Sequence, residues 1–363
     1  MKKLIGLFIL TVIISCQDTP TEVFTDSFDR KAMLVYWADH IIIPSFEAYD
    51  KSLDDLVVAK NIFIENEDIA SFENLRVAYL SAYVSWQTVS MFDIGKAEEI
   101  SLRNYTNIYP ADENQIQSNI QGQNYDLDLP SNFDAQGFPA LDYMLYGLAE
   151  DSNAEITLLK GKDFSNYLNE LVDRLKSLNA EVLNDWKTNF RDSFINNDGS
   201  SATSSTDKLV NDFLFYYEKF LRAGKIGIPA GVFSGSALSN AVEAPYSEIY
   251  SKQLFFAGFE TIQAFFKGVS FEGVQNGTSL EDYLIHVAEQ NNTSSISDEI
   301  LAQWALAEQK ALALGDSFRN QVEVDNIKML QTYDELQKAV ILLKVDMLQA
   351  LNIQVDFVDA DGD

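Results

Sequence analysis

The sequence is poor in the residues that build disulfides, metal sites and nucleophilic catalytic sites. It contains one cysteine and two histidines in 363 residues. A single cysteine cannot form a disulfide within the chain, so the stability of the fold must come from packing. Two histidines leave few imidazoles for a metal site, or for the base that a serine nucleophile needs. The H-E-x-x-H motif, the nucleophile elbow, the P-loop and the dinucleotide fingerprint are also missing.

Basic residues are scarce as well. Lysine and arginine number 26 against 55 acidic residues, a formal net charge of −29. Such a surface repels phosphate backbones, so we expect no nucleic-acid partner. It also repels anionic lipid head groups, which means that protein surface alone would not hold the chain on a membrane. An acidic surface mostly serves solubility, although it can attract cations.

Proline is rare, with 7 residues, and glycine numbers 17, so long uninterrupted helices are allowed. Apolar residues recur at steps of three and four in three segments, which is the pattern of a helix that buries one stripe. The first segment is 72–89, the second is 300–318 and the third is 329–350. Clean alternation of the kind that predicts a strand occurs only in the tail, at 353–358. The sequence therefore predicts an all-α fold of packed helical bundles.

The predicted helices fall into two groups. Further helical stretches are expected at Phe28 to Ala59 with a bend at Pro44, Phe164 to Ile195, Lys208 to Ala223 and Ser247 to Lys267. The segment 196–206 is rich in glycine, serine and aspartate and reads as a flexible linker. The polar segment 112–135 reads as an irregular excursion. We expect two bundle-like halves at 28–195 and 207–363, whose similar lengths suggest duplication of a four-helix-bundle unit.

The N-terminus has the features of an export signal. Lys2 and Lys3 precede a short apolar run, Leu4 to Ile14, which is too short for a permanent membrane span. Ser15 then precedes Cys16, as in a bacterial lipoprotein cleavage box. We expect residues 1–15 to be a signal peptide, Cys16 to carry the lipid that anchors the chain to the membrane, and residues 16–27 to form a tether. The alternative is a plain secretory signal with an incidental cysteine.

The two histidines give weak candidates for a metal site. His40 and Glu47 lie two turns apart on one predicted helix, where an imidazole and a carboxylate could bind a metal or exchange protons. A histidine on a helix surface is the more common reading. His286 and Glu289 form an H-x-x-E pair of the kind that di-iron bundles use twice, but the sequence has no second pair. The acidic tail resembles the start of a calcium loop but lacks the closing glutamate.

The segment QGFPALDYMLYG, residues 136–147, reads as the start of a helix. Pro139 suits a first turn because its missing N–H has no partner there, and a carboxylate such as Asp142 is stabilised near the positive end of the helix dipole. On this reading alone, replacing Asp142 with alanine would cost about 0.3–1 kcal/mol.

Several stretches together resemble the imelysin-like family, in particular its lipoproteins from Bacteroidetes-type bacteria. They are Ile43-Pro44 with Phe46, Trp86-Gln87 followed by FDIGKA, Tyr109-Pro110-Ala111-Asp112, QGFPALDYMLYG, KIGIPAG at 225–231, DYLIH, and the ending KVDMLQALNIQVDFVDADGD. The resemblance implies an α-helical protein of two duplicated bundle-like halves. It also implies a role in iron acquisition at the cell envelope, and some members are described as metallopeptidases.

The family's hallmark is G-x-H-x-x-E at the start of a helix, and this chain departs from it. The glycine falls on Gly137, but Pro139 replaces the histidine and Asp142 replaces the glutamate. Ser90 stands where the family has another glutamate. A site without its imidazole keeps only hard oxygen ligands, which suit transition metals less well, and catalytic zinc normally takes three protein ligands.

The leading hypothesis is a non-catalytic, lipid-anchored protein of the outer membrane that binds a ligand, such as iron or haem, or an envelope iron-uptake protein. The expected site is the groove between the halves near 137–142. Its expected lining is Asp142, Tyr143, His40, Glu47 and Trp86. The alternatives are an imelysin-type metallopeptidase, and a structural or adhesive surface protein without a ligand.

Overall fold

The computed structural model describes residues 27–357, and within this range every regular element is a helix. The predicted all-α fold is confirmed. An isolated antiparallel bridge joins Val269 and Asn276, and the tail segment 353–357 forms no strand. The signal peptide, Cys16, nearly all of the tether and the last six residues lie outside the described range.

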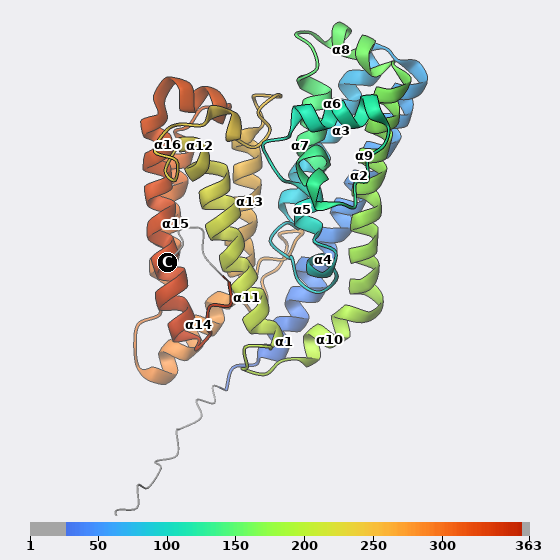
Figure 1. Ribbon diagram of the computed structural model, residues 1–363. Coiled ribbons are helices and arrows are strands. Elements are labelled where there is room, and N and C mark those ends of the chain that lie inside the picture. Colours follow the sequence, from blue (N-terminus) through green and yellow to red (C-terminus); the bar gives the residue numbers. More distant parts are fainter. Residues whose placement is uncertain (1–26, 358–363) are drawn as a thin grey trace, which may run out of the picture.

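Helices up to residue 196 make up the first half of the molecule (Figure 1). They are α1 (Arg30–Tyr36), η1 (Trp37–Ile42), α2 (Ile43–Asn66), α3 (Ile69–Gln87), α4 (Lys96–Glu99), α5 (Leu102–Thr106), α6 (Glu113–Gly122), η2 (Pro130–Ala135), α7 (Gly137–Tyr146), α8 (Ser152–Leu159), α9 (Lys162–Asp185), η3 (Trp186–Phe190) and α10 (Arg191–Asn196). The structure adds α6 to a segment that we expected to be irregular. Ile116 and Ile120, four residues apart, are buried on one face of this otherwise polar helix.

The second half starts with α11 after a connection at 197–204. Its helices are α11 (Ser205–Phe215), η4 (Tyr216–Gly227), α12 (Ile228–Ala230), η5 (Ser239–Ala241), α13 (Ser251–Phe266), α14 (Leu280–Asn291), α15 (Ser297–Leu312), α16 (Phe318–Ile341), η6 (Leu342–Met347) and α17 (Leu348–Ala350). The stripe expected to run through 300–318 is broken between α15 and α16. The break contains Gly315 and ends at Ser317, whose side chain accepts from the Asn320 backbone N–H (3.1 Å) and caps α16.

Pro44 shapes the first long helix by leaving a carbonyl group free. Proline has no N–H to donate to the residue four positions earlier, which is His40. The His40 carbonyl accepts instead from the backbone N–H of Phe271 at 2.8 Å. The turns just before Pro44 are π-helical (η1), where we expected a simple bend. A loop of the second half is thereby attached to the first helix.

The two halves share one hydrophobic core. Figure 1 shows α2 and α9 on one side, α15 and α16 on the other, and α11 and α13 facing the first half. α13 packs against α3 across the boundary. The ring of Trp37 lies 4.7 Å from that of Phe265, and the buried apolar residues of both halves form a single cluster. Among residues 27–357, no helix combines the length and the apolar character that a bilayer span requires.

Candidate functional site

The family motif lies on α7, a helix that is buried along nearly its whole length. Gly137 begins it with φ of 71°, and a Cβ at this position would overlap the backbone oxygen of Thr106. The glycine is therefore needed for backbone shape and for close packing. Pro139 is buried two residues later and has no side-chain atom that could bind a metal.

Asp142 lies beyond the first turn of α7, because the helix already begins at Gly137. The expected stabilisation by the helix dipole is therefore not its main role. Its carboxylate is fully buried and accepts three hydrogen bonds: from the backbone N–H groups of Tyr246 (2.8 Å) and Ser247 (3.3 Å), and from the Tyr79 hydroxyl (3.2 Å). Burial outweighs these bonds and raises the pKa of Asp142 to about 6. The carboxylate ties the first half to the segment that leads into α13.

Tyr143 and Trp86, two other predicted site residues, are both buried. The Tyr143 hydroxyl accepts from the Gln117 side-chain amide (3.0 Å), and its ring lies 5.1 Å from that of Tyr246. Trp86 is 1% exposed and packs against Tyr49 at 5.7 Å, and its indole N–H has no hydrogen-bond partner in the described part of the chain. Asp142 and Tyr143 thus meet at Tyr246, whereas Trp86 borders a separate cavity described below.

His40 and Glu47 do not join Asp142, so the expected convergence of the five residues is not found. His40 is exposed, and its Nδ1 lies 3.0 Å from the amide nitrogen of Gln275. Glu47 is exposed and forms an ion pair with Lys187 (2.5 Å). The π-helical turns between these positions change the residues per turn, so a spacing of seven no longer places both side chains on one face.

The second histidine, His286, contacts Ser27 and Phe28. The Nε2 of His286 lies 3.2 Å from the Ser27 hydroxyl, and its ring packs near Phe28 at 5.5 Å. Within the described range, no three histidine, cysteine, aspartate or glutamate side chains are placed to hold a metal ion together.

A buried polar cluster between the halves was not predicted from the sequence. The Lys225 ammonium donates to the Gln87 side-chain oxygen (2.9 Å) and forms an ion pair with Glu243. Glu243 also accepts from the amides of Gln87 (3.0 Å) and Asn107 (2.7 Å). Burial lowers the pKa of Lys225, with Glu243 opposing the shift. Lys225 comes from the KIGIPAG segment, and it is held inward by the long π-helix η4.

Arg103 forms a second buried link between the halves. Its guanidinium lies 3.1 Å from Asp212 and 3.4 Å from Asp93, and its Nε donates to the Ser90 carbonyl (2.9 Å). The Asp93 backbone N–H donates to Asp212 at 2.6 Å. Burial raises the pKa of Asp212 to about 7, although Arg103 acts in the opposite direction. Ser90, at a position where the resemblance implies a glutamate, therefore contributes a backbone oxygen to Arg103.

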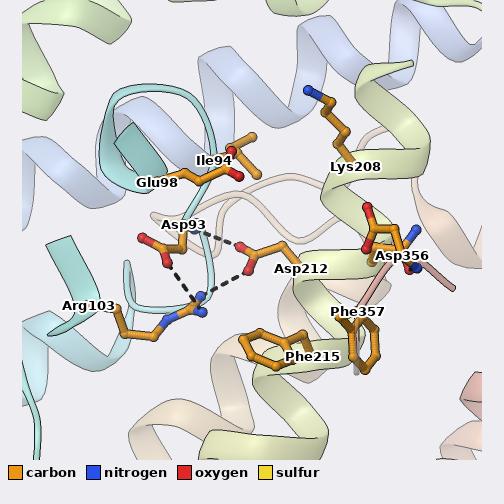
Figure 2. A pocket seen from close by; sticks show the side chains of 10 residues that line it. Asp93, Ile94, Glu98, Arg103, Lys208, Asp212, Phe215, Asp356 and Phe357 are labelled. Atoms are coloured by element: carbon orange, nitrogen blue, oxygen red, sulfur yellow. Dashed lines mark hydrogen bonds and ion pairs between the residues drawn. The ribbon is translucent and has the colours of Figure 1, made fainter. Parts of the chain in front are cut away.

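Arg103, Asp93 and Asp212 border an open cavity of about 280 Å³, which we call the outer pocket (Figure 2). It is lined by Asp93, Ile94, Glu98, Arg103, Lys208, Asn211, Asp212, Phe215, Asp356 and Phe357. Figure 2 shows the Arg103 guanidinium between the carboxylates of Asp93 and Asp212. The Phe215 and Phe357 rings pack at 5.1 Å and form an apolar wall. The outer pocket therefore offers charges of both signs beside an apolar surface.

Arg103 also borders a much smaller cavity, which we call the inner cavity. Its volume is about 10 Å³. It is lined by Trp86, Gln87, Ser90, Arg103, Asn107, Tyr109, Tyr216, Phe220 and Lys225. Arg103 therefore lines both cavities. Asp142 lines neither of these two cavities, and residues 137–142, where we expected a binding groove, are buried.

Two solved structures have a fold similar to that of this chain. The crystal structure of an imelysin-like protein from Psychrobacter arcticum 273-4 matches with a TM-score of 0.69 and 18% identity, covering 90% of this chain and 97% of that one. The structure of a protein described as a candidate iron-regulated protein A precursor, from Parabacteroides distasonis ATCC 8503, matches with a TM-score of 0.68 and 16% identity. That match covers 88% of this chain and 96% of the other. At these identities the likeness shows a common fold.

The sequence itself gives the family. No curated protein sequence matches the chain. The family model Peptidase_M75, described as Imelysin, matches residues 42–344, which include α7 with its altered motif, the Lys225 cluster and the links made by Arg103. The resemblance inferred from QGFPALDYMLYG and the other stretches is confirmed, and the chain belongs to the imelysin family.

Proposed function

We propose that this chain is a non-catalytic binding component of iron acquisition, held at the bacterial outer membrane by a lipid on Cys16. Membership of the imelysin family supports the link to iron, as does the fold in common with a protein described as iron-regulated. The arrangement of signal peptide, small residue and cysteine supports the anchor.

The residues at the positions of the family motif are the reason for proposing that the chain is not catalytic. Asp142 is fully buried and its two oxygens already accept from three donors, so binding a metal would break bonds that hold the halves together. The side chain of Pro139 offers no ligand atom, and the buried polar cluster between the halves contains the Lys225 ammonium, which repels cations. This set of groups does not suit a catalytic zinc ion with three protein ligands and an activated water.

The outer pocket is the best place for a ligand. Its volume of about 280 Å³ is close to the lower end of the range for small-molecule sites. Glu98 and Asp356 add carboxylates to its wall, Lys208 adds an ammonium group, and the two phenylalanine rings add apolar area. An iron chelate or haem, with charged groups on an apolar body, or a protruding segment of a partner protein has the matching chemistry.

Metal and haem titration of residues 17–363 tests the proposal. We expect saturable binding of an iron species or haem by calorimetry, and at least tenfold weaker binding in Glu98→Gln, which lines the outer pocket. Asp334→Asn, on the exposed face of α16, is the matched control and should bind as the parent does. Unchanged binding in Glu98→Gln would show that the ligand binds outside the outer pocket. No binding at micromolar protein would rule out these small ligands and leave a protein partner as the remaining candidate. Chelator-sensitive cleavage of a protein substrate would contradict the non-catalytic assignment.

The anchor has its own test. Cells that express the full chain and are fed a labelled fatty acid should yield labelled protein in the outer-membrane fraction. Cys16→Ala should abolish the label and release the protein from that fraction. A labelled Cys16→Ala protein would show that the lipid is elsewhere, and an unlabelled parent would show a plain secretory signal.

A further inference from the structure

The inner cavity lies on the boundary between the halves and is walled by groups that donate hydrogen bonds. Trp86 comes from the first half and Tyr216 and Lys225 from the second. The indole N–H of Trp86 and the hydroxyl of Tyr216 are buried, at 1% and 2% exposure, and have no hydrogen-bond partner among residues 27–357. The Ser90 hydroxyl lies near that of Tyr216, but no hydrogen bond of good geometry joins them. Buried donors without acceptors are costly, so a ligand that accepts from them is favoured.

Lys225 adds a third donor to this cavity. Its ammonium group has three N–H bonds, and the described residues provide two acceptors, Gln87 and Glu243. One N–H bond is therefore available. Arg103, on the opposite wall, adds a second fixed positive charge; its two carboxylate partners, Asp93 and Asp212, line the outer pocket and not the inner cavity.

The two side-chain amide oxygens that line the inner cavity already accept hydrogen bonds. The Gln87 oxygen accepts from Lys225, and the Asn107 oxygen accepts from the Tyr83 hydroxyl at 2.6 Å. A water molecule could donate to the hydroxyl oxygens of Ser90 and Tyr216, whereas an anion only accepts and is also attracted by the positive charges of Lys225 and Arg103. The volume of about 10 Å³ has room for one particle of roughly water size. We propose that the inner cavity binds a monovalent anion of halide size, which joins the two halves.

This proposal is independent of iron binding in the outer pocket. It makes the anion a structural ligand, because it would contact Trp86 and Arg103 of the first half together with Tyr216 and Lys225 of the second. Anything that binds the folded chain but not the unfolded one raises stability with its concentration. Chloride or bromide should therefore raise the Tm of the chain beyond the effect of a bulky anion at equal ionic strength.

Crystals of residues 17–363 grown or soaked in sodium bromide give the direct test. We expect an anomalous peak between Trp86, Tyr216 and Lys225, and a refined water without anomalous signal at that place would overturn the proposal. Solution measurements complement it: at a chloride concentration ten times Kd, the Tm should rise by about 2 °C or more over the same concentration of sodium gluconate. Equal Tm values in the two salts would count against an anion.

Two variants identify the cavity as the origin of the effect. Trp86→Phe removes an N–H donor with little change of shape, and it should weaken the apparent halide affinity about fivefold to tenfold. Trp37→Phe is the matched control, because Trp37 is also buried with an unpartnered indole N–H but does not border the inner cavity. An equal halide response in the parent and in both variants would show that any salt effect arises elsewhere.

Discussion

Replacing Asp142 with alanine should destabilise the whole molecule and should do so in a pH-dependent way. The change leaves the backbone N–H groups of Tyr246 and Ser247 and the hydroxyl of Tyr79 without their acceptor. Each buried donor without an acceptor costs about 1–3 kcal/mol, and removing a buried carboxylate returns part of that sum. We expect a net loss of about 2–4 kcal/mol in the free energy of unfolding at pH 7.5.

The pH dependence follows from the raised pKa of Asp142, about 6 in the folded chain against an ordinary value of 3.8. Because the folded state binds the proton more tightly, the contribution of this group to stability grows as pH falls through 6 and is lost as pH rises through 6. Between pH 8 and pH 5 the parent should therefore gain about 1.4 kcal/mol from this residue, which the alanine variant cannot gain. The gap between parent and variant should widen by that amount on acidification.

Urea unfolding of residues 17–363 at pH 8 and pH 5 measures both effects. Asp334→Ala, on the exposed face of α16, is the control and should change stability by no more than about 0.5 kcal/mol at either pH. A loss below about 1 kcal/mol at Asp142, with the same gap at both pH values, would refute the reasoning. Asp142 would then contribute little to holding the two halves together.

Three further substitutions test other parts of the structure. Gly137→Ala forces a Cβ onto a neighbouring backbone oxygen at positive φ, so thermal unfolding should show a loss of about 3 kcal/mol or more. Lys225→Met leaves Glu243 buried without its cation and should lower the free energy of unfolding in urea by about 3–5 kcal/mol. Adding Glu243→Gln should recover much of this loss. If the effects of the two substitutions simply added, the pairing would be contradicted. Pro44→Ala supplies an intrahelical donor that competes with the Phe271 amide, so hydrogen exchange at Phe271 should accelerate while the free energy of unfolding changes by less than about 1 kcal/mol.

Helical periodicity predicted much of the architecture because burial of one stripe leaves a local signal. Tyr79 and Trp86 on α3, and Trp304 on α15, are buried as the three-and-four spacing requires. The breaks and irregular turns in the helices left weaker signals in the sequence. The break after Leu312 depends on a serine cap and one glycine inside an otherwise continuous stripe. The π-helical turns before Pro44 depend on a carbonyl partner at residue 271, which no local pattern reveals.

The candidate site was less predictable because its contacts are distant in sequence. Asp142 was recognised through a motif, but its partners Tyr246 and Ser247 follow it by more than 100 residues, so its structural role could not be read from its surroundings. His40 and Glu47 were grouped by helical spacing, whereas their partners in space are Gln275 and Lys187. The inward position of Lys225 results from η4 and Glu243, and a single lysine carries no sign of it.

The single hydrophobic core has a consequence for how the chain must be made. A ribosome releases the first half before the second exists, so Trp37, Phe92 and the face of α3 cannot make their contacts with α13 until α13 has been synthesised. During this interval the nascent chain exposes apolar surface that invites aggregation or chaperone binding. For the same reason, either half expressed alone should be poorly soluble, and the complete chain should unfold as one cooperative unit. Both halves must therefore be present before the core of the molecule can form.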